Sequence, residues 1–494
     1  MLFYFVLRFI LEHMKFWKQL EGAVLGKYFL LLPVFIAVLG ATTTLPSLRD
    51  QTYEIESVGS AWINDSAILY TQKWSHYSPQ TLWVGSLYGN YITSDLAVIV
   101  YEALFICLVG LLAYATLKRT NDNEIHNRTL LLLAASALLI PGAWQIGVTP
   151  AKLSLLFILS TYFFYFSWKR SSKNYWLFGE TAKNWRFALL TGIFGSLTIF
   201  TSVYFCIFLL PLIVDFFKTA KKQNLSLLRQ ISFLIMPVLI EFWVWYSVLS
   251  PRRLITDALR AGIIDFKILT NDTSFLVNSW PLMLATLLVA SLAIAGIAAK
   301  NLRKNPLSWW YSLVVIASLI FIPAAGIQAV LIIIMLSGII YSNEASRIVR
   351  PAFLIAGSFL LLVVSLPLRT TLQKELLLDK TEAALAASYI EQRLVDSRYV
   401  YYYGSSAGFY SFSDFKNPTR FYDARIFKYD NPTLQLESKF RGDIEAERPL
   451  FVVYATGSRT KAPKIDRLEE YFQKHYEEVA NISGYRILKR SSNL

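Results

Sequence analysis

The chain has 494 residues, of which 55% are hydrophobic and only 17% are charged, and its mean hydropathy is +0.42. A water-soluble globular protein does not carry so much apolar sequence, so the composition predicts a polytopic membrane protein. The net charge of +14 would suggest a nucleic-acid partner in a soluble protein. Here the Lys and Arg residues cluster in short connectors between apolar segments, where they set orientation, and we expect no nucleic acid as a partner.

The cysteines and the first residues give no sign of a metal site or a cleaved signal. Cys107 and Cys206 lie far apart inside apolar segments, without the spacing of a metal-binding motif. Residues 1–22 are apolar and basic but lack a small-residue cleavage site. We therefore expect an interfacial helix that leads into the first span, and no metal ligand set.

Apolar segments long enough to cross a hydrocarbon layer of about 30 Å recur along residues 1–369. Segment 187–217 would reach about 46 Å as a single helix, so we divide it near Phe200 to Tyr204. The other spans are expected near 28–46, 96–117, 130–147, 151–168, 231–250, 276–299, 308–323, 326–342 and 351–368. The prediction is an α-helical membrane protein with about eleven transmembrane helices.

The basic connectors support the division of segment 187–217. With the N-terminus in the cytoplasm, all of them fall inside only if this segment crosses twice. They carry Lys118, Arg119, Arg128, Lys169, Arg170, Lys173, Lys183, Arg186, Lys218, Lys221, Lys222, Lys300, Arg303, Lys304, Arg347 and Arg350. Loop 47–95, loop 251–275 and the tail after Pro367 then face the extracytoplasmic side of the plasma membrane.

The tail changes character and predicts a separate extracytoplasmic domain, 370–494, after a membrane domain, 1–369. Helical spacing in "KELLLDKTEAALAASYIEQRL" and "IDRLEEYFQKHYEEV" alternates with the strand-like "RYVYYYG" and "ERPLFVVYA". Such alternation favours a small α/β domain, and about 125 residues suffice for a core of its own.

This arrangement resembles the GT-C superfamily of membrane glycosyltransferases, particularly bacterial relatives of protein O-mannosyltransferases and of the aminoarabinose transferase that modifies lipid A. The matching positions are Asp50, Tyr53, Ala61 and Pro79 in the first outer loop, and Gly404, Tyr410, Pro418-Thr419-Arg420, Pro449 and Gly484-Tyr485 in the tail. The sequence departs from the family at Gln51, where a Glu usually follows the Asp, and in "GSLTIFTSVYF", which lacks a Lys often found there.

The resemblance implies a transferase that moves a sugar from a polyprenyl-phosphate donor to an acceptor at the extracytoplasmic membrane face. The acceptor is a lipid, a glycan or a protein, and membrane lipid surrounds the enzyme. One carboxylate suffices for the inverting displacement, so the resemblance implies no definite cofactor, with a divalent cation as the alternative.

Four carboxylates, Asp50, Glu54, Glu56 and Asp65, follow the first span. In the resembled family an acidic residue at the membrane surface takes the proton of the acceptor hydroxyl, and we assign this role to Asp50. On a helix Glu54 shares the face of Asp50, as a helper or a metal-facing ligand, whereas Glu56 points elsewhere. The alternative is that a water-exposed loop simply requires polar side chains.

The outer segment "SPRRLITDALRAGIIDFK" breaks the orientation rule because it is basic. Its arginines could bind the leaving phosphate, which gains charge in the transition state and accepts bidentate hydrogen bonds. The candidates are Arg252, Arg253 and Arg260, with Lys267 further off and Lys152 at another outward turn. The alternatives are contact with anionic lipid headgroups and local ion pairs with Asp257, Asp265 and Asp272.

Glu241, in "MPVLIEFWVWYS", is taken as the one acid well inside a predicted span, where a carboxylate is costly enough to indicate function. It equally fits a place near the outer end of the span, paired with Arg252 or Arg253.

Three other functions remain open: a transporter or flippase for lipid-linked sugars, an envelope polysaccharide polymerase or ligase, and a non-catalytic assembly protein. Only the transferase requires loops 47–95 and 251–275 to converge on one cavity at the outer membrane surface.

Overall fold

The computed structural model describes the acidic loop, part of the helical membrane region and most of the tail. Apart from short gaps, the described residues are 53–120, 147–170, 174–177, 180–183, 185–222, 227–249, 255–271, 381–394, 398–430, 435–456 and 462–491, with single residues between 127 and 135. The predicted first span and the predicted spans between 276 and 368 lie outside this part, so the count of eleven stays a prediction.

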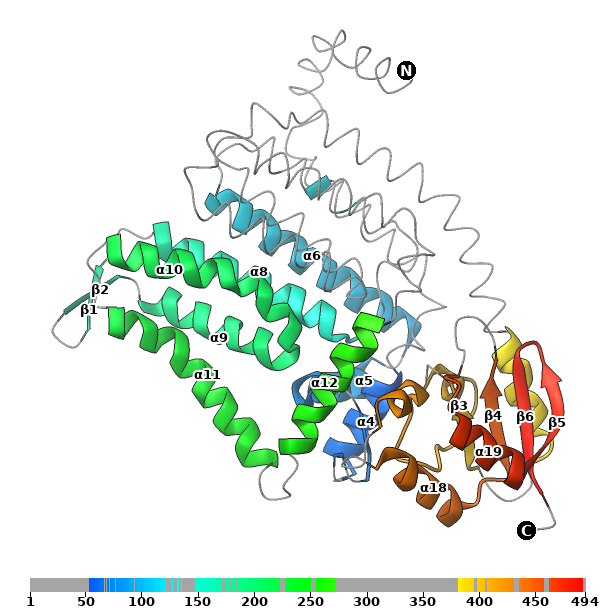
Figure 1. Ribbon diagram of the computed structural model, residues 1–494. Helices are drawn as coiled ribbons and strands as arrows, with labels where there is room; N and C mark the ends of the chain where they lie inside the picture. Colours follow the sequence, from blue (N-terminus) through cyan, green and yellow to red (C-terminus); the bar gives the residue numbers. More distant parts are fainter. Residues whose placement is uncertain are drawn as a thin grey trace, which may run out of the picture.

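Long helices lie side by side in the membrane region (Figure 1). They are α6 (Asp95–Thr120), α8 (Pro150–Arg170), α9 (Trp185–Thr201), α10 (Leu210–Lys222) and α11 (Leu227–Leu249). Among the described residues, Leu96–Arg119, Pro150–Arg170 and Ile231–Leu249 are long and apolar enough to cross a membrane. The chain is therefore a membrane protein.

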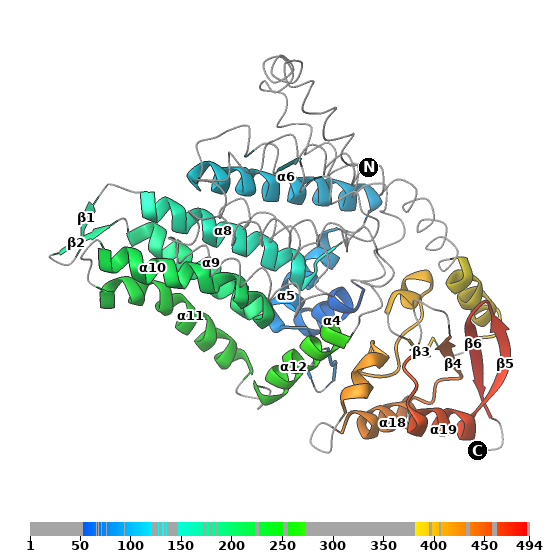
Figure 2. The same cartoon turned by 45° about the horizontal axis from the view of Figure 1, so that its top comes forward.

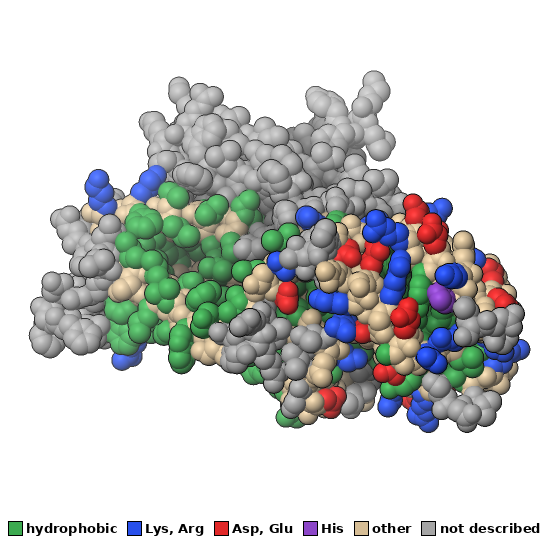
Figure 3. Space-filling view, turned by 60° about the horizontal axis from the view of Figure 1, so that its bottom comes forward, with side chains coloured by type: hydrophobic (Ala, Val, Ile, Leu, Met, Phe, Trp, Pro, Cys, Tyr) green, Lys and Arg blue, Asp and Glu red, His purple; other side chains and the backbone are tan. Residues whose placement is uncertain are grey.

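The outer surface of these helices matches a lipid environment. In Figure 3 apolar side chains cover the exposed helical surface, whereas acidic and basic side chains are interspersed over the tail. Exposed apolar side chains on α6 and α11 include Leu104, Leu111, Leu239 and Trp243. A soluble protein rarely exposes so large an apolar surface.

The chain turns back within segment 187–217, as predicted. Helix α9 ends at Thr201, the 3-10 helix η4 (Val203–Leu209) follows, and α10 begins at Leu210. The Lys169 ammonium at the end of α8 lies 2.5 Å from the Asp215 carboxylate of α10. The end of α8 therefore lies beside the middle of α10.

The basic ends of the helices gather at one end of the bundle. Arg170 donates a hydrogen bond to the Lys118 carbonyl (3.4 Å), so α6 also ends beside α8. An antiparallel hairpin of β1 (Asn174–Leu177) and β2 (Glu180–Lys183) lies in the connection from α8 to α9. This arrangement agrees with the predicted threading, in which these ends face the cytoplasm.

Two helices of the acidic loop pack at the opposite end. Helix α4 (Tyr53–Ile63) crosses α5 (Pro79–Tyr91), and a Cβ on Gly59 would collide with the Leu82 carbonyl oxygen, so the helices approach closely there. Ser78 caps α5 by accepting from the Thr81 N–H, with Pro79 in the first turn. Its hydroxyl also bonds the Thr201 carbonyl (3.0 Å), which ties the loop to the end of α9.

Helix α12 (Ile255–Asn271) follows α11 and joins the same core. Ala261, Ile264 and Ile268 of α12 belong to one buried cluster with Ile55 and Val58 of α4. Figure 2 shows α4, α5 and α12 between the membrane helices and the C-terminal sheet. The acidic loop and the segment after α11 therefore converge, as the transferase hypothesis requires, while a cavity between them stays a prediction.

The C-terminal region, residues 381–491, is built on a four-stranded sheet of order β3-β4-β6-β5. Strand β3 (Val400–Tyr403) is parallel to β4 (Phe451–Ala455), and β6 (Tyr485–Arg490) is antiparallel to β4 and to β5 (Tyr476–Ile482). Its helical elements are residues 381–391, η8 (Ala407–Phe412), η9 (Ala424–Tyr429), α18 (Leu436–Glu447) and α19 (Asp466–His475).

The strands predicted in "RYVYYYG" and "ERPLFVVYA" are confirmed. The helix predicted in "IDRLEEYFQKHYEEV" ends at His475, where β5 begins, so that prediction is half right. The core of the sheet belongs to the same buried cluster as α4 and α12.

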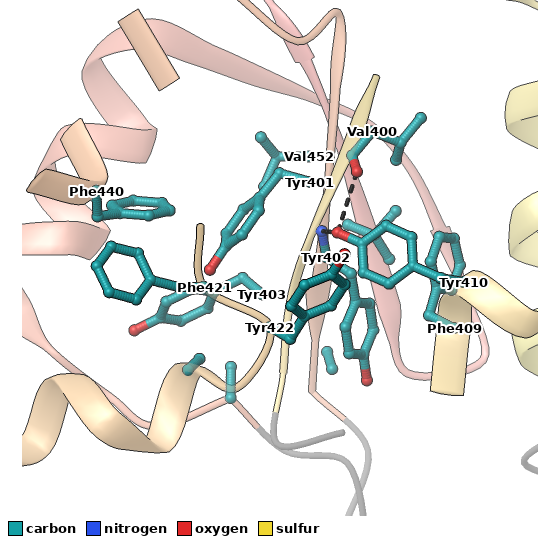
Figure 4. Packing of buried hydrophobic residues seen from close by; sticks show 14 of the residues in the cluster. Val400, Tyr401, Tyr402, Tyr403, Phe409, Tyr410, Phe421, Tyr422, Phe440 and Val452 are labelled. Carbon is teal, nitrogen blue, oxygen red and sulfur yellow. Dashed lines mark hydrogen bonds between the residues drawn. The ribbon is translucent and has the colours of Figure 1, made fainter. Parts of the chain in front are cut away.

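Buried aromatic side chains pack against the sheet (Figure 4). Tyr401 and Tyr403 are fully buried, and the Tyr410 hydroxyl accepts from the Tyr402 N–H (2.9 Å) and donates to the Val400 carbonyl (3.1 Å). Strand β3 is an edge strand of the sheet, so the Tyr410 hydroxyl makes hydrogen bonds that a further strand would otherwise make.

Candidate functional site

Some of the predicted site residues lie within the described part of the chain and others do not. Asp50, Arg252 and Arg253 lie outside the described residues. Asp50 precedes Tyr53, the first residue of α4, by three positions, and Arg252 follows Leu249, the last residue of α11, by three. Leu249 is part of the core shared with α4, and Tyr53 packs against it.

Glu54 is buried, with 6% of its surface exposed, and accepts a hydrogen bond from the Ser75 hydroxyl to Oε1 (2.7 Å). The Glu54 carboxylate lies near Tyr422 of the C-terminal region. The pKa of Tyr422 is raised by burial first, and then by the neighbouring Tyr53 and Glu54. A buried carboxylate needs such bonds to remain in place. Glu54 therefore has a fixed orientation, which suits a supporting role beside a base.

Glu56 lies on another face of α4. A Cβ placed on Gly89 of α5 would lie 3.4 Å from the Glu56 Cβ atom, so the base of the Glu56 side chain lies against α5. The divergence of Glu54 and Glu56 is what helical geometry predicts for residues two apart. No group of three His, Cys, Asp or Glu side chains that could hold a metal occurs among the described residues.

Arg260 forms an ion pair with Asp257 of its own helix, at 3.7 Å, with both side chains about one third exposed. This contact matches the alternative of local ion pairs in loop 251–275. Lys267 lies where α12 meets the C-terminal region: its carbonyl accepts from the Tyr429 hydroxyl (3.2 Å), and its ammonium lies 5.8 Å from the centre of the Tyr429 ring.

A surface groove of about 610 Å³ opens beside this contact. It is lined by Phe427, Lys428, Tyr429, Lys464, Ile465 and Asp466.

Lys152 lies in a buried ion pair with Glu102, a residue that the sequence analysis passed over. The ammonium is 2.8 and 2.7 Å from the two carboxylate oxygens of Glu102 and 2.7 Å from the Gly147 carbonyl. The Gly147 N–H also donates to Glu102 (2.8 Å), from a left-handed conformation with φ of 81° that favours glycine. Three acceptors match the three ammonium protons, which favours a structural role over phosphate binding.

Glu102 also corrects the statement that Glu241 is the one acid within a predicted span. It lies in α6, inside the predicted span 96–117, and its side chain is 0% exposed. The signal was present in the sequence, because an acid inside an apolar span requires a partner, and Lys152 begins the span that packs against α6.

Glu241 is half-buried between α9 and α11. It accepts hydrogen bonds from the Ser196 hydroxyl (2.5 Å) and from the Trp245 side chain. The Trp245 ring lies 6.3 Å from that of Trp62 in α4. Glu241 is thus accommodated by neighbouring helices, and pairing with Arg252 or Arg253 involves residues outside the described part.

No protein-family model matches the sequence, and no curated protein matches it. Solved structures of the Archaeoglobus fulgidus oligosaccharyltransferase are among those similar to the chain. The apo form has a TM-score of 0.46 and 13% identity, over 95% of this chain and 75% of that chain. The complex with an inhibitory peptide and a dolichol-phosphate has a TM-score of 0.46 and 12% identity, over 94% and 74%.

Proposed function

We propose that the chain is an integral membrane glycosyltransferase that moves a sugar from a polyprenyl-phosphate donor to an acceptor hydroxyl, with inversion, at the extracytoplasmic face. One observation carries the proposal. Helix α4 of the acidic loop and helix α12, which follows the basic Arg252-Arg253 pair, pack into one core at the end of the bundle opposite the basic connectors.

The chemistry requires such a convergence. The polyprenyl tail of the donor stays in lipid while the acceptor arrives from water, so the reacting atoms meet only at the membrane surface. Catalysis then needs a base for the acceptor proton and cations for the leaving phosphate, held together in one place. Asp50 is three residues from α4, and Arg252 and Arg253 are three and four residues from the end of α11.

The proposed roles follow from the placements. Asp50 is the general base, and Arg252 and Arg253 bind the donor phosphate as charge develops on it. Glu54, buried and bonded to Ser75, supports the base from the first turn of α4. Lys152, Arg260 and Glu241 have partners within the protein and take structural roles in this proposal.

The test is turnover by the purified protein in vesicles that contain a labelled polyprenyl-phosphate sugar. Transferase activity releases polyprenyl phosphate and moves the label into an acceptor fraction. A flippase would move the intact donor across the bilayer without breaking the sugar–phosphate bond. Transbilayer movement of an uncleaved donor would refute the proposal.

A further inference from the structure

We propose that Tyr410 and Tyr422 of the C-terminal region are positioning residues, which hold the first turn of α4 and with it the carboxylates of the acidic loop. The inference rests on the proposed function, because it assigns the C-terminal sheet a task in the same reaction. We call these contacts, made by Tyr53, Tyr410 and Tyr422, the tyrosine latch.

The latch is a cluster of three rings. Tyr53 is the first residue of α4, and its ring stacks on Tyr410 with centroids 6.2 Å apart and an interplanar angle of 21°. Tyr422 completes the cluster, 6.4 Å from Tyr53 and 5.8 Å from Tyr410. Aromatic pairs at these separations are attractive beyond the area that they bury.

Tyr410 is itself immobilised. Its hydroxyl bonds the Tyr402 N–H and the Val400 carbonyl of β3, and its side chain is 2% exposed. The latch is therefore anchored to the backbone of the C-terminal sheet, not to a surface loop. Because Tyr410 is fixed to β3, the ring of Tyr53 that stacks on it is held in a fixed place relative to the sheet.

The segment of the acidic loop between α4 and α5 is attached to the same place. The Trp74 N–H donates to the Arg420 carbonyl (2.9 Å), and the Trp74 ring lies 6.0 Å from that of Phe421. Arg420 is fixed in turn by two side-chain hydrogen bonds to Asp443, at 2.9 and 2.7 Å. Trp74 precedes Ser75, the partner of Glu54, so one segment of the tail, 420–422, holds both ends of the Glu54 hydrogen bond.

A cation strengthens the contact. The Lys73 ammonium lies 5.4 Å from the centre of the Tyr422 ring, within the range of a cation–π interaction. Burial lowers the pKa of Lys73, and the carboxylates of Asp443 and Asp65, which face it, partly oppose this shift by favouring the ammonium form.

The consequence concerns distance from the proposed base. Glu54 follows Tyr53 directly, and Asp50 lies three residues before it. A misplacement of about 1 Å at a reacting group can cost on the order of a hundredfold in rate. Release of the latch should therefore lower turnover without changing how the donor binds.

The experiment combines hydrogen exchange with kinetics on the full-length protein. In Tyr422→Ala, amides of residues 53–63 should exchange about tenfold faster or more, since α4 loses one of its two aromatic contacts with the C-terminal region and Tyr410 loses a ring that packs against it. The kcat should fall about ten- to a hundredfold with the KM for the polyprenyl-phosphate sugar unchanged. Tyr422→Phe keeps the ring and should restore both. Tyr53→Ala should reproduce the defect from the other side of the contact, with the aromatic core of the sheet intact.

Tyr471→Ala is the matched control. Tyr471 is a buried aromatic residue on α19 whose ring packs on His475, with centroids 4.5 Å apart, so its loss perturbs the C-terminal region away from α4. The inference is overturned if exchange in α4 stays slow in both Tyr422→Ala and Tyr53→Ala, or if it rises while kcat is unchanged. A wild-type protein without transferase activity would refute the proposed function alone, and exchange would then decide whether the latch holds α4.

Discussion

Lys152 and Glu102, fifty residues apart in sequence, form an ion pair whose side chains are 1% and 0% exposed. The pair joins α8 to α6 near the ends that lie toward the acidic loop. The Gly147 backbone accepts from the lysine and donates to the glutamate, so the two charges form one closed network with it. Its geometry makes a sharp prediction about stability.

Replacing one partner of this ion pair should lower the free energy of unfolding far more than replacing both partners together. Lys152→Met or Glu102→Leu alone leaves an uncompensated buried charge and should lower the free energy of unfolding by about 3–5 kcal/mol. The double variant should recover most of the loss, because apolar side chains replace both charges. Unfolding of the detergent-solubilised protein measures all three. Arg398→Ala, which breaks an exposed pair with Asp414, is the control, and unchanged stability in both single variants would contradict the account.

Replacement by Phe should have opposite effects on stability at Tyr401 and at Tyr410. The buried Tyr401 hydroxyl has no hydrogen-bond partner among the described atoms, so Tyr401→Phe should raise the free energy of unfolding by about 1–3 kcal/mol. Tyr410→Phe removes two backbone hydrogen bonds and should lower it by a similar amount. Denaturant titration of the two variants gives the comparison, and a less stable Tyr401→Phe protein would be evidence against this packing.

The same tyrosines predict how stability depends on pH. Burial raises the pKa of Tyr401 and Tyr410 well above the ordinary value of 10.0. Since the folded-state pKa exceeds that of the unfolded chain, the stabilising contribution is complete below pH 10. It is lost as the pH rises above that value through the folded-state pKa. The unfolding midpoint should therefore fall as the pH rises above 10, and less so in Tyr401→Phe.

The sequence predicted the strands of the C-terminal sheet where composition alone decides them. Runs such as "VYYY" and "FVVYA" are aromatic or β-branched and bounded by turn residues. Strand β5 was missed because "YEEVANI" continues the charged pattern of the preceding helix, and only its pairing with β6 makes it a strand. In this segment, pairing with β6 outweighs the local helical propensity.

The site was predictable only in part for a related reason. The pairing of Arg260 with Asp257 is local, three residues along one helix, and was foreseen as an alternative. The Lys152–Glu102 pair depends on the packing of α6 against α8, and the latch joins Tyr53 to residues in the tail. The sequence indicates that Glu102, an acid inside an apolar span, requires a partner, but no spacing in the sequence identifies contacts of that range.

The orientation of the chain gives a prediction for reporter fusions. A reporter fused after residue 400 should be active only outside the cytoplasm, and fusions at 175 and 302 only inside it. Position 175 lies in the hairpin beside the basic ends of the helices, and position 400 starts β3 at the other end of the molecule. Cytoplasmic activity of the fusion after residue 400 would reverse the placement of the acidic loop.

The arginines after α11 should control use of the donor. Replacing both Arg252 and Arg253 with Ala should weaken transition-state binding by about 1.5–3 kcal/mol for each charged hydrogen bond lost, with the amount of protein in the membrane unchanged. Lysine should rescue only in part, because it cannot make a bidentate contact. Kinetics with varied polyprenyl-phosphate sugar measure this, with Arg398→Ala as a control away from the loop. Normal donor kinetics in the double variant would remove loop 251–275 from the mechanism.

The central claim is that an acid at the start of the first outer loop is the general base, and turnover of a polyprenyl-phosphate sugar by purified variants tests it most directly. Asp50→Asn keeps the shape of the side chain but removes the basic oxygen, and should reduce the rate on the order of a hundred- to ten-thousandfold. Glu54→Gln should have an intermediate effect, and Glu56→Gln, on the other face of α4, should be nearly silent. Normal turnover in Asp50→Asn, with or without loss of activity in Glu54→Gln or Glu56→Gln, would contradict the account.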